Sequence, residues 1–142
     1  MRIQRSARWS LILLGLFSMS PVLADSITNS AVNRLTSVEW FAFGGVGYAG
    51  VTSEGEADFK VVLAQPTQTA LKAFEKLFAI GNPQAKSYAL SGLKKLAPQR
   101  FRELLATTTN STKTVEVMRG CILSHEPLRE VAKQIDQGQF QF

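Results

Sequence analysis

The sequence predicts a mainly α-helical domain, built from antiparallel helical hairpins with a small β element. Two observations predict the helices. Apolar residues recur every three or four positions from Thr67 onward, and breaks containing proline or glycine separate these stretches at helix-length intervals. A third observation predicts the β element, because apolar and polar residues alternate over residues 115–118. The 142-residue chain has one cysteine, Cys121, so its stability comes from packing rather than from internal disulfides.

Residues 1–24 have the pattern of a secretory signal peptide, which predicts a periplasmic or secreted protein. Three arginines and no acidic residue precede an apolar run over residues 11–17, and compact side chains lead up to Ala24. The apolar run is shorter than the about 20 residues that span a bilayer. We therefore expect cleavage after Ala24, a single helical domain over residues 25–142 and no stable membrane anchor. An uncleaved anchor is the alternative.

The charge of the predicted domain is nearly balanced. Cleavage removes three of the 16 basic residues, and the remaining 13 against 11 acidic residues leave a net charge of +2. This small excess, with no basic run interleaved with aromatic residues, argues against a nucleic-acid partner. A lone cysteine also excludes thiolate metal clusters. We expect no cofactor and no metal ion.

The start of the domain carries short, mixed signals. Residues 25–34 are polar and fit either a short helix or a loose lead-in, whereas the apolar and aromatic residues 38–43 fit a short buried strand or the end of a helix. The glycines within residues 44–50 predict a tight turn. Ser53 and Glu56 have the spacing of a capping box, which predicts that a helix begins there.

Helical patterns dominate the middle of the chain. The expected helices cover residues 57–65, 67–80, 85–96 and 98–107. Asn82 is expected as an N-cap, with Pro83 at the first helical position. Turns as short as those between these segments require the helices to pack as antiparallel hairpins.

The C-terminal part is expected to hold the β element and a last helix. A polar linker over residues 107–114 leads into a strand over residues 115–123, with Gly120 as a bulge or turn. Residues 128–135 have a helical apolar face. We expect the last four residues, 139–142, to be frayed.

The glycine-rich turn is the first candidate site. Residues 45–50, GVGYAG, match the G-x-G-x-x-G pattern of dinucleotide-binding loops. That fold needs a long helix directly after the motif, whereas Glu54 and Glu56 here bring negative charge to the phosphate position. A tight turn with positive φ angles is the plain interpretation, and the lip of a binding surface is the functional one. The predicted binding residues are Gly44, Gly45, Gly47, Tyr48 and Gly50, together with exposed faces around Tyr88 and Arg100.

A second candidate is a cysteine–histidine pair. Cys121 and His125 are the only residues of their types and lie four positions apart, which on a helix would place a nucleophile beside its base. On a strand the same spacing separates them by about 13 Å, too far for proton transfer. The plain interpretation is a buried, apolar cysteine and a surface histidine.

Two resemblances add to these patterns. Residues 67–105 resemble HEAT-like helical hairpins, over about a third of the chain. Solenoids of such hairpins need about three repeats to bury a continuous core. This chain has room for about one and a half.

The second resemblance covers most of the predicted domain. It rests on FAFGGVGYAG, Glu54-Gly55-Glu56, YALSGL, Arg119-Gly120-Cys121-Ile122 and Glu126-Pro127. These motifs are similar to a family of small exported bacterial proteins without assigned activity, some of which occur beside microcin export and processing genes. The resemblance implies a non-enzymatic accessory protein that binds another envelope or secreted protein, linked to microcin production or export. A thiol-type hydrolase using Cys121 and His125 is one alternative, and a toxin-binding immunity or inhibitor protein is another.

Overall fold

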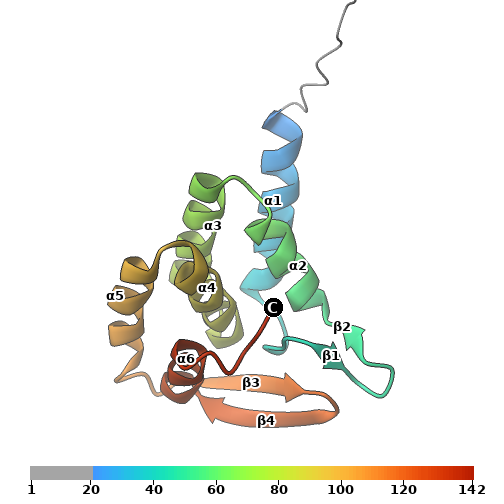
Figure 1. The fold of residues 1–142 in the computed structure, drawn as a ribbon, viewed down its shortest axis with the longest axis vertical. Helices are drawn as coiled ribbons and strands as arrows, with labels where there is room; N and C mark the ends of the chain where they lie inside the picture. Colours follow the sequence, from blue (N-terminus) through green and yellow to red (C-terminus); the bar gives the residue numbers. More distant parts are fainter. Residues whose placement is uncertain (1–20) are drawn as a thin grey trace, which may run out of the picture.

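The structure, a computed structural model, describes residues 21–142, with side chains from residue 25 (Figure 1). These residues form six helices and two short antiparallel hairpins, so the predicted mainly α fold with a small β element is confirmed. The helices are α1 (Pro21–Thr36), α2 (Glu54–Leu63), α3 (Thr67–Ile80), α4 (Pro83–Leu96), α5 (Pro98–Thr108) and α6 (Leu128–Asp136). The strands are β1 (Gly45–Val46), β2 (Val51–Thr52), β3 (Thr114–Arg119) and β4 (Ile122–Pro127).

The predicted signal peptide lies almost wholly outside the described residues. Its predicted cleavage point, after Ala24, falls in the first turn of α1. None of the helices over residues 21–142 is long and apolar enough to cross a membrane.

The polar residues 25–34 suggest a short helix or a loose lead-in, whereas the structure has the 16-residue helix α1 there. Its inner face buries Ala31, Val32 and Leu35 completely or almost completely against the rest of the core. At its C-terminal end the Arg34 Nε donates to Asp58 Oδ2 of α2 over 2.8 Å. The helix forms because spaced apolar residues find a partner surface, which propensity alone does not reveal.

Helices α2 to α5 follow the sequence signals closely. Ser53 caps α2 by accepting from the backbone N–H of Glu56, and Asn82 caps α4 in the same way from Ala85. Helices α3 and α4 pack side by side, and Gly92 allows their close approach. A Cβ at this position would lie only 2.4 Å from the Phe74 ring. Helix α4 lies at the centre and also contacts α5 and α6 (Figure 1).

The β element consists of two strands where the sequence pattern suggests one. Strands β3 and β4 pair antiparallel and are joined by Gly120 and Cys121, with Gly120 at a φ of +59°. A positive φ at the first loop residue suits the twist of a two-residue hairpin. Phe41 adds a short contact along β3, because its N–H donates to Glu116 O and its carbonyl accepts from Met118 N.

The core is aromatic at its centre and includes the C-terminal tail. The rings of Phe41, Phe43, Phe59 and Tyr88 pack edge to face or tilted against one another. The prediction of a frayed tail is wrong. The Phe140 ring lies 4.7 Å from that of Phe41, and the Phe142 ring lies 4.8 Å from those of Phe43 and Phe59. The tail stays in place because its two rings complete this cluster.

Candidate protein-binding surface

The β1–β2 hairpin carries the predicted glycine-rich loop. Its strands pair Gly45 with Thr52 and Val46 with Val51. The glycines that precede and close the loop have positive φ angles: Gly44 (+84°), Gly47 (+69°) and Gly50 (+60°). A Cβ on Gly45 would lie 2.9 Å from the carbonyl oxygen of Gly50. The glycines therefore serve a closely folded hairpin, as the plain interpretation of the motif expects.

Hydrogen bonds hold this hairpin at its base and at its tip. At the base, Gly44 N donates to Glu56 Oε2 over 2.9 Å, and Lys60 Nζ donates to Glu56 Oε1 over 2.7 Å. At the tip, Gly47 N donates to Gly120 O over 2.9 Å, which joins the loop to the turn between β3 and β4. The two hairpin tips therefore project as one unit, on the right in Figure 1.

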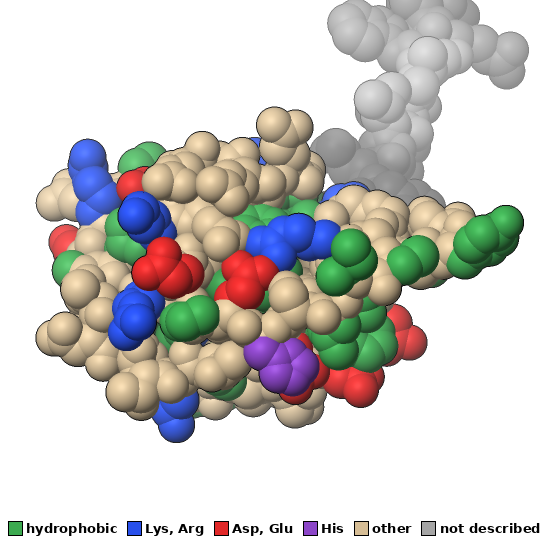
Figure 2. Space-filling view, turned by 90° about the horizontal axis from the view of Figure 1, so that it is seen from below, with side chains coloured by type: hydrophobic (Ala, Val, Ile, Leu, Met, Phe, Trp, Pro, Cys, Tyr) green, Lys and Arg blue, Asp and Glu red, His purple; other side chains and the backbone are tan. Residues whose placement is uncertain are grey.

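Apolar side chains crowd this projecting unit. Tyr48 is fully exposed, and the exposed fractions of Val51, Ile122 and Leu123 are 57%, 71% and 44%. Cys121 is also exposed and lies in the turn beside them. We call these five residues the tip surface. Figure 2 shows hydrophobic side chains along the arm that extends from the body of the molecule. Adjoining exposed apolar side chains of this kind mark interaction sites more often than isolated ones do.

A polar network fixes the β3–β4 hairpin to the body. Arg119 forms an ion pair with Glu126 and donates to Gln134 Oε1 over 2.7 Å. Ser124 Oγ also donates to Glu126, over 2.8 Å. The hydrogen bonds from Arg119, with those from Ser124 and Gln134, lower the pKa of Glu126 below its usual value, against an opposing effect of burial. The Arg119 guanidinium lies 5.1 Å from the Phe140 ring, so the network also contacts the tail.

The two predicted binding residues on the helices do not join the tip surface. The expectation of an exposed Tyr88 is wrong, because the residue is fully buried. Its hydroxyl donates to Ala42 O (2.8 Å) and accepts from Ala42 N (3.0 Å). Burial raises the pKa of Tyr88. Arg100 lies on α5, on the opposite side from the β1–β2 hairpin, where it pairs with Glu75 and Glu103 (Figure 1). The structure thus separates these two residues from the glycine-rich loop.

The cysteine and histidine occupy different parts of the β3–β4 hairpin. The expectation of a buried Cys121 is wrong, because the residue lies exposed in the turn. His125 is exposed on β4 and pairs across the ladder with Glu116. An extended strand rises by about 10 Å from Ile122 to His125, so the histidine lies well along β4 from the turn that holds Cys121. The structure therefore supplies no nucleophile–base contact here.

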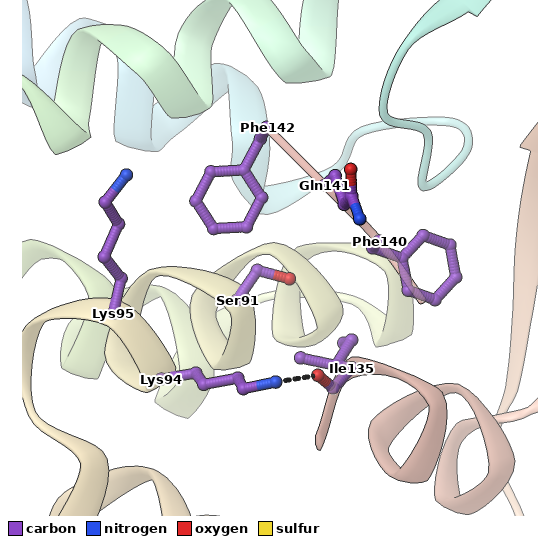
Figure 3. Close-up of a pocket in the computed structure, with 7 residues that line it drawn as sticks. All are labelled: Ser91, Lys94, Lys95, Ile135, Phe140, Gln141 and Phe142. Atoms are coloured by element: carbon purple, nitrogen blue, oxygen red, sulfur yellow. Dashed lines mark hydrogen bonds between the residues drawn. The ribbon is translucent and has the colours of Figure 1, made fainter. Parts of the chain in front are cut away.

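Two cavities flank the aromatic core. One, of about 320 Å³, lies against the C-terminal tail, where Phe140 and Phe142 extend over α4 and Lys94 Nζ donates to Ile135 O over 2.6 Å (Figure 3). The other, of about 640 Å³, lies between α1, α2 and the β1–β2 hairpin, and we call it the side cleft. Its lining residues are Arg34, Ser37, Val38, Glu39, Trp40, Val46, Val51, Thr52, Ser53, Glu54, Gly55 and Asp58. Sequence patterns missed this cleft because it forms only when residues 34–40, Val46 and residues 51–58 fold against one another.

Comparison with protein families, curated proteins and solved structures finds no match to this chain. Across the described residues, no group of three or more histidine, cysteine, aspartate or glutamate side chains is placed to hold a metal ion. The tip surface and the side cleft are therefore the features from which a function is inferred.

Proposed function

We propose that this protein is a non-enzymatic accessory protein of the bacterial envelope or of the secreted fraction, and that it binds another protein through the tip surface. The observation that carries the proposal is the full exposure of Tyr48 beside three exposed aliphatic side chains on two joined hairpin tips. Tyrosine is among the residues that most often dominate protein–protein binding energy. The partner would offer an apolar pocket that accepts the Tyr48 ring.

The way the hairpins are fastened supports this role. Tyr48 follows Gly47, whose N–H is hydrogen-bonded to the β3–β4 turn, and the base of the loop is bonded to Glu56. A surface that is ordered before binding loses less conformational entropy when the partner docks. The tip surface is thus preorganised in its backbone while its side chains remain uncovered.

The location and the process belong to the same proposal. The signal-peptide pattern of residues 1–24 supports export, and the similarity to small exported proteins supports a role beside microcin production or export. A toxin-binding or inhibitory role would use the same surface, with the toxin as the partner. The hydrolase alternative would need Cys121 beside His125, whereas Cys121 lies in the turn and His125 lies on β4 opposite Glu116.

Cys121 supplies a native position for a direct test. The full chain, labelled at this single thiol with a maleimide photo-crosslinker and irradiated in an envelope extract, is expected to give one discrete crosslinked species. Tyr48→Asp should lower its yield about tenfold, and Ile122→Asp should have a similar effect, because both place a charge in the apolar contact. Mass spectrometry then identifies the partner.

The matched control is Ile80→Asp, which adds the same charge to a 57% exposed isoleucine at the end of α3. Its yield should equal that of the wild type. A crosslinked species that persists in Tyr48→Asp, or that is lost equally in Ile80→Asp, would contradict the proposal. Circular dichroism of each variant separates lost binding from lost folding.

A further inference from the structure

We propose that the side cleft is a second binding site, which accepts a basic, extended segment of a partner protein. The inference deepens the proposed function and rests on it, because the β1–β2 hairpin forms both the wall of the cleft and part of the tip surface. Val51 belongs to both. A partner that covers the tip would therefore reach the cleft directly.

The size and the walls of the cleft suit a peptide. Its volume of about 640 Å³ lies within the about 300–1,000 Å³ of typical ligand sites. Val38, Trp40, Val46 and Val51 supply apolar wall area, and Trp40 is only half-buried. Such walls accept the aliphatic stems of lysine and arginine, and an indole ring attracts their charged ends.

The charge of the side cleft determines which kind of partner segment it can bind. Arg34 and three carboxylates line the cleft, which gives it a net charge of −2 in a chain whose total is +5. Arg34 is already paired with Asp58. Over residues 25–142, neither Glu39 nor Glu54 forms an ion pair. Glu54 also acts on Arg34, whose single charge faces three carboxylates, so the cleft keeps an excess of negative charge beside its apolar wall. This excess attracts a cation and repels phosphate or an acidic peptide.

The tail cavity is a weaker candidate for the same partner. The chain's own Phe140 and Phe142 already line it, and two lysines give it positive charge (Figure 3). Phe142 is held by two aromatic rings and lies 5.2 Å from Lys95 Nζ. A basic segment would meet like charge there, so the side cleft is the site that complements it.

Trp40 provides the readout. In the full chain carrying Trp9→Phe it is the only tryptophan, so its emission reports on the cleft alone. A seven-residue peptide that alternates leucine with arginine is expected to shift this emission saturably, with weaker binding as salt rises. Glu39→Gln combined with Glu54→Gln should weaken binding about tenfold.

The control combines Glu103→Gln with Glu130→Gln, which removes the same charge outside the cleft, from exposed positions on α5 and α6 where each carboxylate pairs with an arginine. This control should bind like the wild type. Equal binding of a leucine–glutamate peptide, or no response of Trp40 at all, would overturn the proposal. Full competition by spermidine would also overturn it, by assigning the cleft to a small amine. Dimerisation of the chain that shifts Trp40 emission without peptide would assign the cleft to a second copy.

Failure of the cleft proposal can be distinguished from failure of the tip-surface proposal. Tyr48→Asp should lower crosslinking to the partner about tenfold. It should leave peptide binding at Trp40 unchanged, because Tyr48 does not line the cleft. The double glutamine variant should weaken peptide binding while Tyr48 remains fully exposed. Failure of one site therefore leaves the other testable.

Discussion

The chain's two tyrosines, at positions 48 and 88, have opposite environments. Tyr88 is fully buried on the central helix, packs on three phenylalanine rings and bonds both backbone groups of Ala42. Tyr48 is fully exposed at the tip of a hairpin. A tyrosine thus stabilises the fold at position 88, whereas at position 48 its side chain is left uncovered. Stability and binding can therefore be changed separately in this molecule.

The largest expected effect comes from removing the two rings in turn. Tyr88→Ala should lower the free energy of unfolding by about 3–5 kcal/mol, because it empties the centre of the aromatic core. Tyr48→Ala should change it by less than about 0.5 kcal/mol. Urea unfolding followed by circular dichroism measures both. A comparable loss in Tyr48→Ala would mean that the tip contributes to the fold and would undo the contrast.

Removing only the hydroxyl of Tyr88 isolates its hydrogen bonds. Tyr88→Phe leaves the N–H and C=O of Ala42 without this partner, which should cost about 1–3 kcal/mol at neutral pH. Burial raises the pKa of Tyr88 in the folded protein, so its contribution to stability is fully present below pH 10.0 and is lost as the pH rises through the folded value. The deficit of Tyr88→Phe should therefore shrink above pH 10.0.

Tyr48→Phe is the control for this pH dependence. Its stability at neutral pH should equal that of the wild type, since the Tyr48 side chain is fully exposed. Urea midpoints at neutral pH and at about pH 11 are sufficient. A constant deficit for Tyr88→Phe across this range would show that burial does not shift the Tyr88 titration.

The C-terminal tail tests how far the aromatic core extends. Phe142 is 38% exposed, yet its ring contacts those of Phe43 and Phe59. Phe142→Ala should cost about 1–2 kcal/mol, less than a fully buried ring, whereas Gln141→Ala should cost less than about 0.5 kcal/mol. Thermal unfolding compares the two. Equal stability of both variants would mean that the tail does not belong to the core in solution.

The sequence predicted helices α2 to α4 well, because apolar stripes and capping residues are signals carried by neighbouring residues. The apolar stripe over residues 67–80, the Asn82 cap and the Ser53–Glu56 capping box all appear where the sequence placed them. The expectation of an exposed binding face around Tyr88 was wrong, because Tyr88 is fully buried. Helix α4 is buried on nearly all sides over residues 84–93, although Ser87 and Ser91 give it a polar-looking face. These small serines can be buried because each bonds a carbonyl of the preceding turn, so the face around Tyr88 is covered.

The site was predictable only in part, for a similar reason. The glycines predicted the tight turn of the β1–β2 hairpin, though not its strands, because positive φ angles select glycine locally. The contribution of Ile122 and Leu123 was missed, since these exposed residues are brought to the glycine-rich loop only by the bridge between Val46 and Gly120, which are distant in the sequence. The docking of Phe142 was missed because its partner rings lie more than 80 residues earlier in the sequence. Contacts of this separation leave no local pattern.

The smallest expected effect concerns the link between the two regions. Glu126→Gln removes the charge that Arg119 pairs with at the base of the β3–β4 hairpin. Because Arg119 is 45% exposed, the loss of stability should be below about 1 kcal/mol at neutral pH.

The lowered pKa of Glu126 means that its contribution to stability is fully present above the usual value of 4.5 and is lost as the pH falls through the lower folded value. The deficit should therefore vanish in acid. The rate at which Cys121 reacts with a thiol reagent adds a local readout, because a turn released from the body should expose its thiol more freely. An unchanged rate together with a measurable loss of stability would place the effect of Glu126 in the body alone and leave the tip surface independent of it.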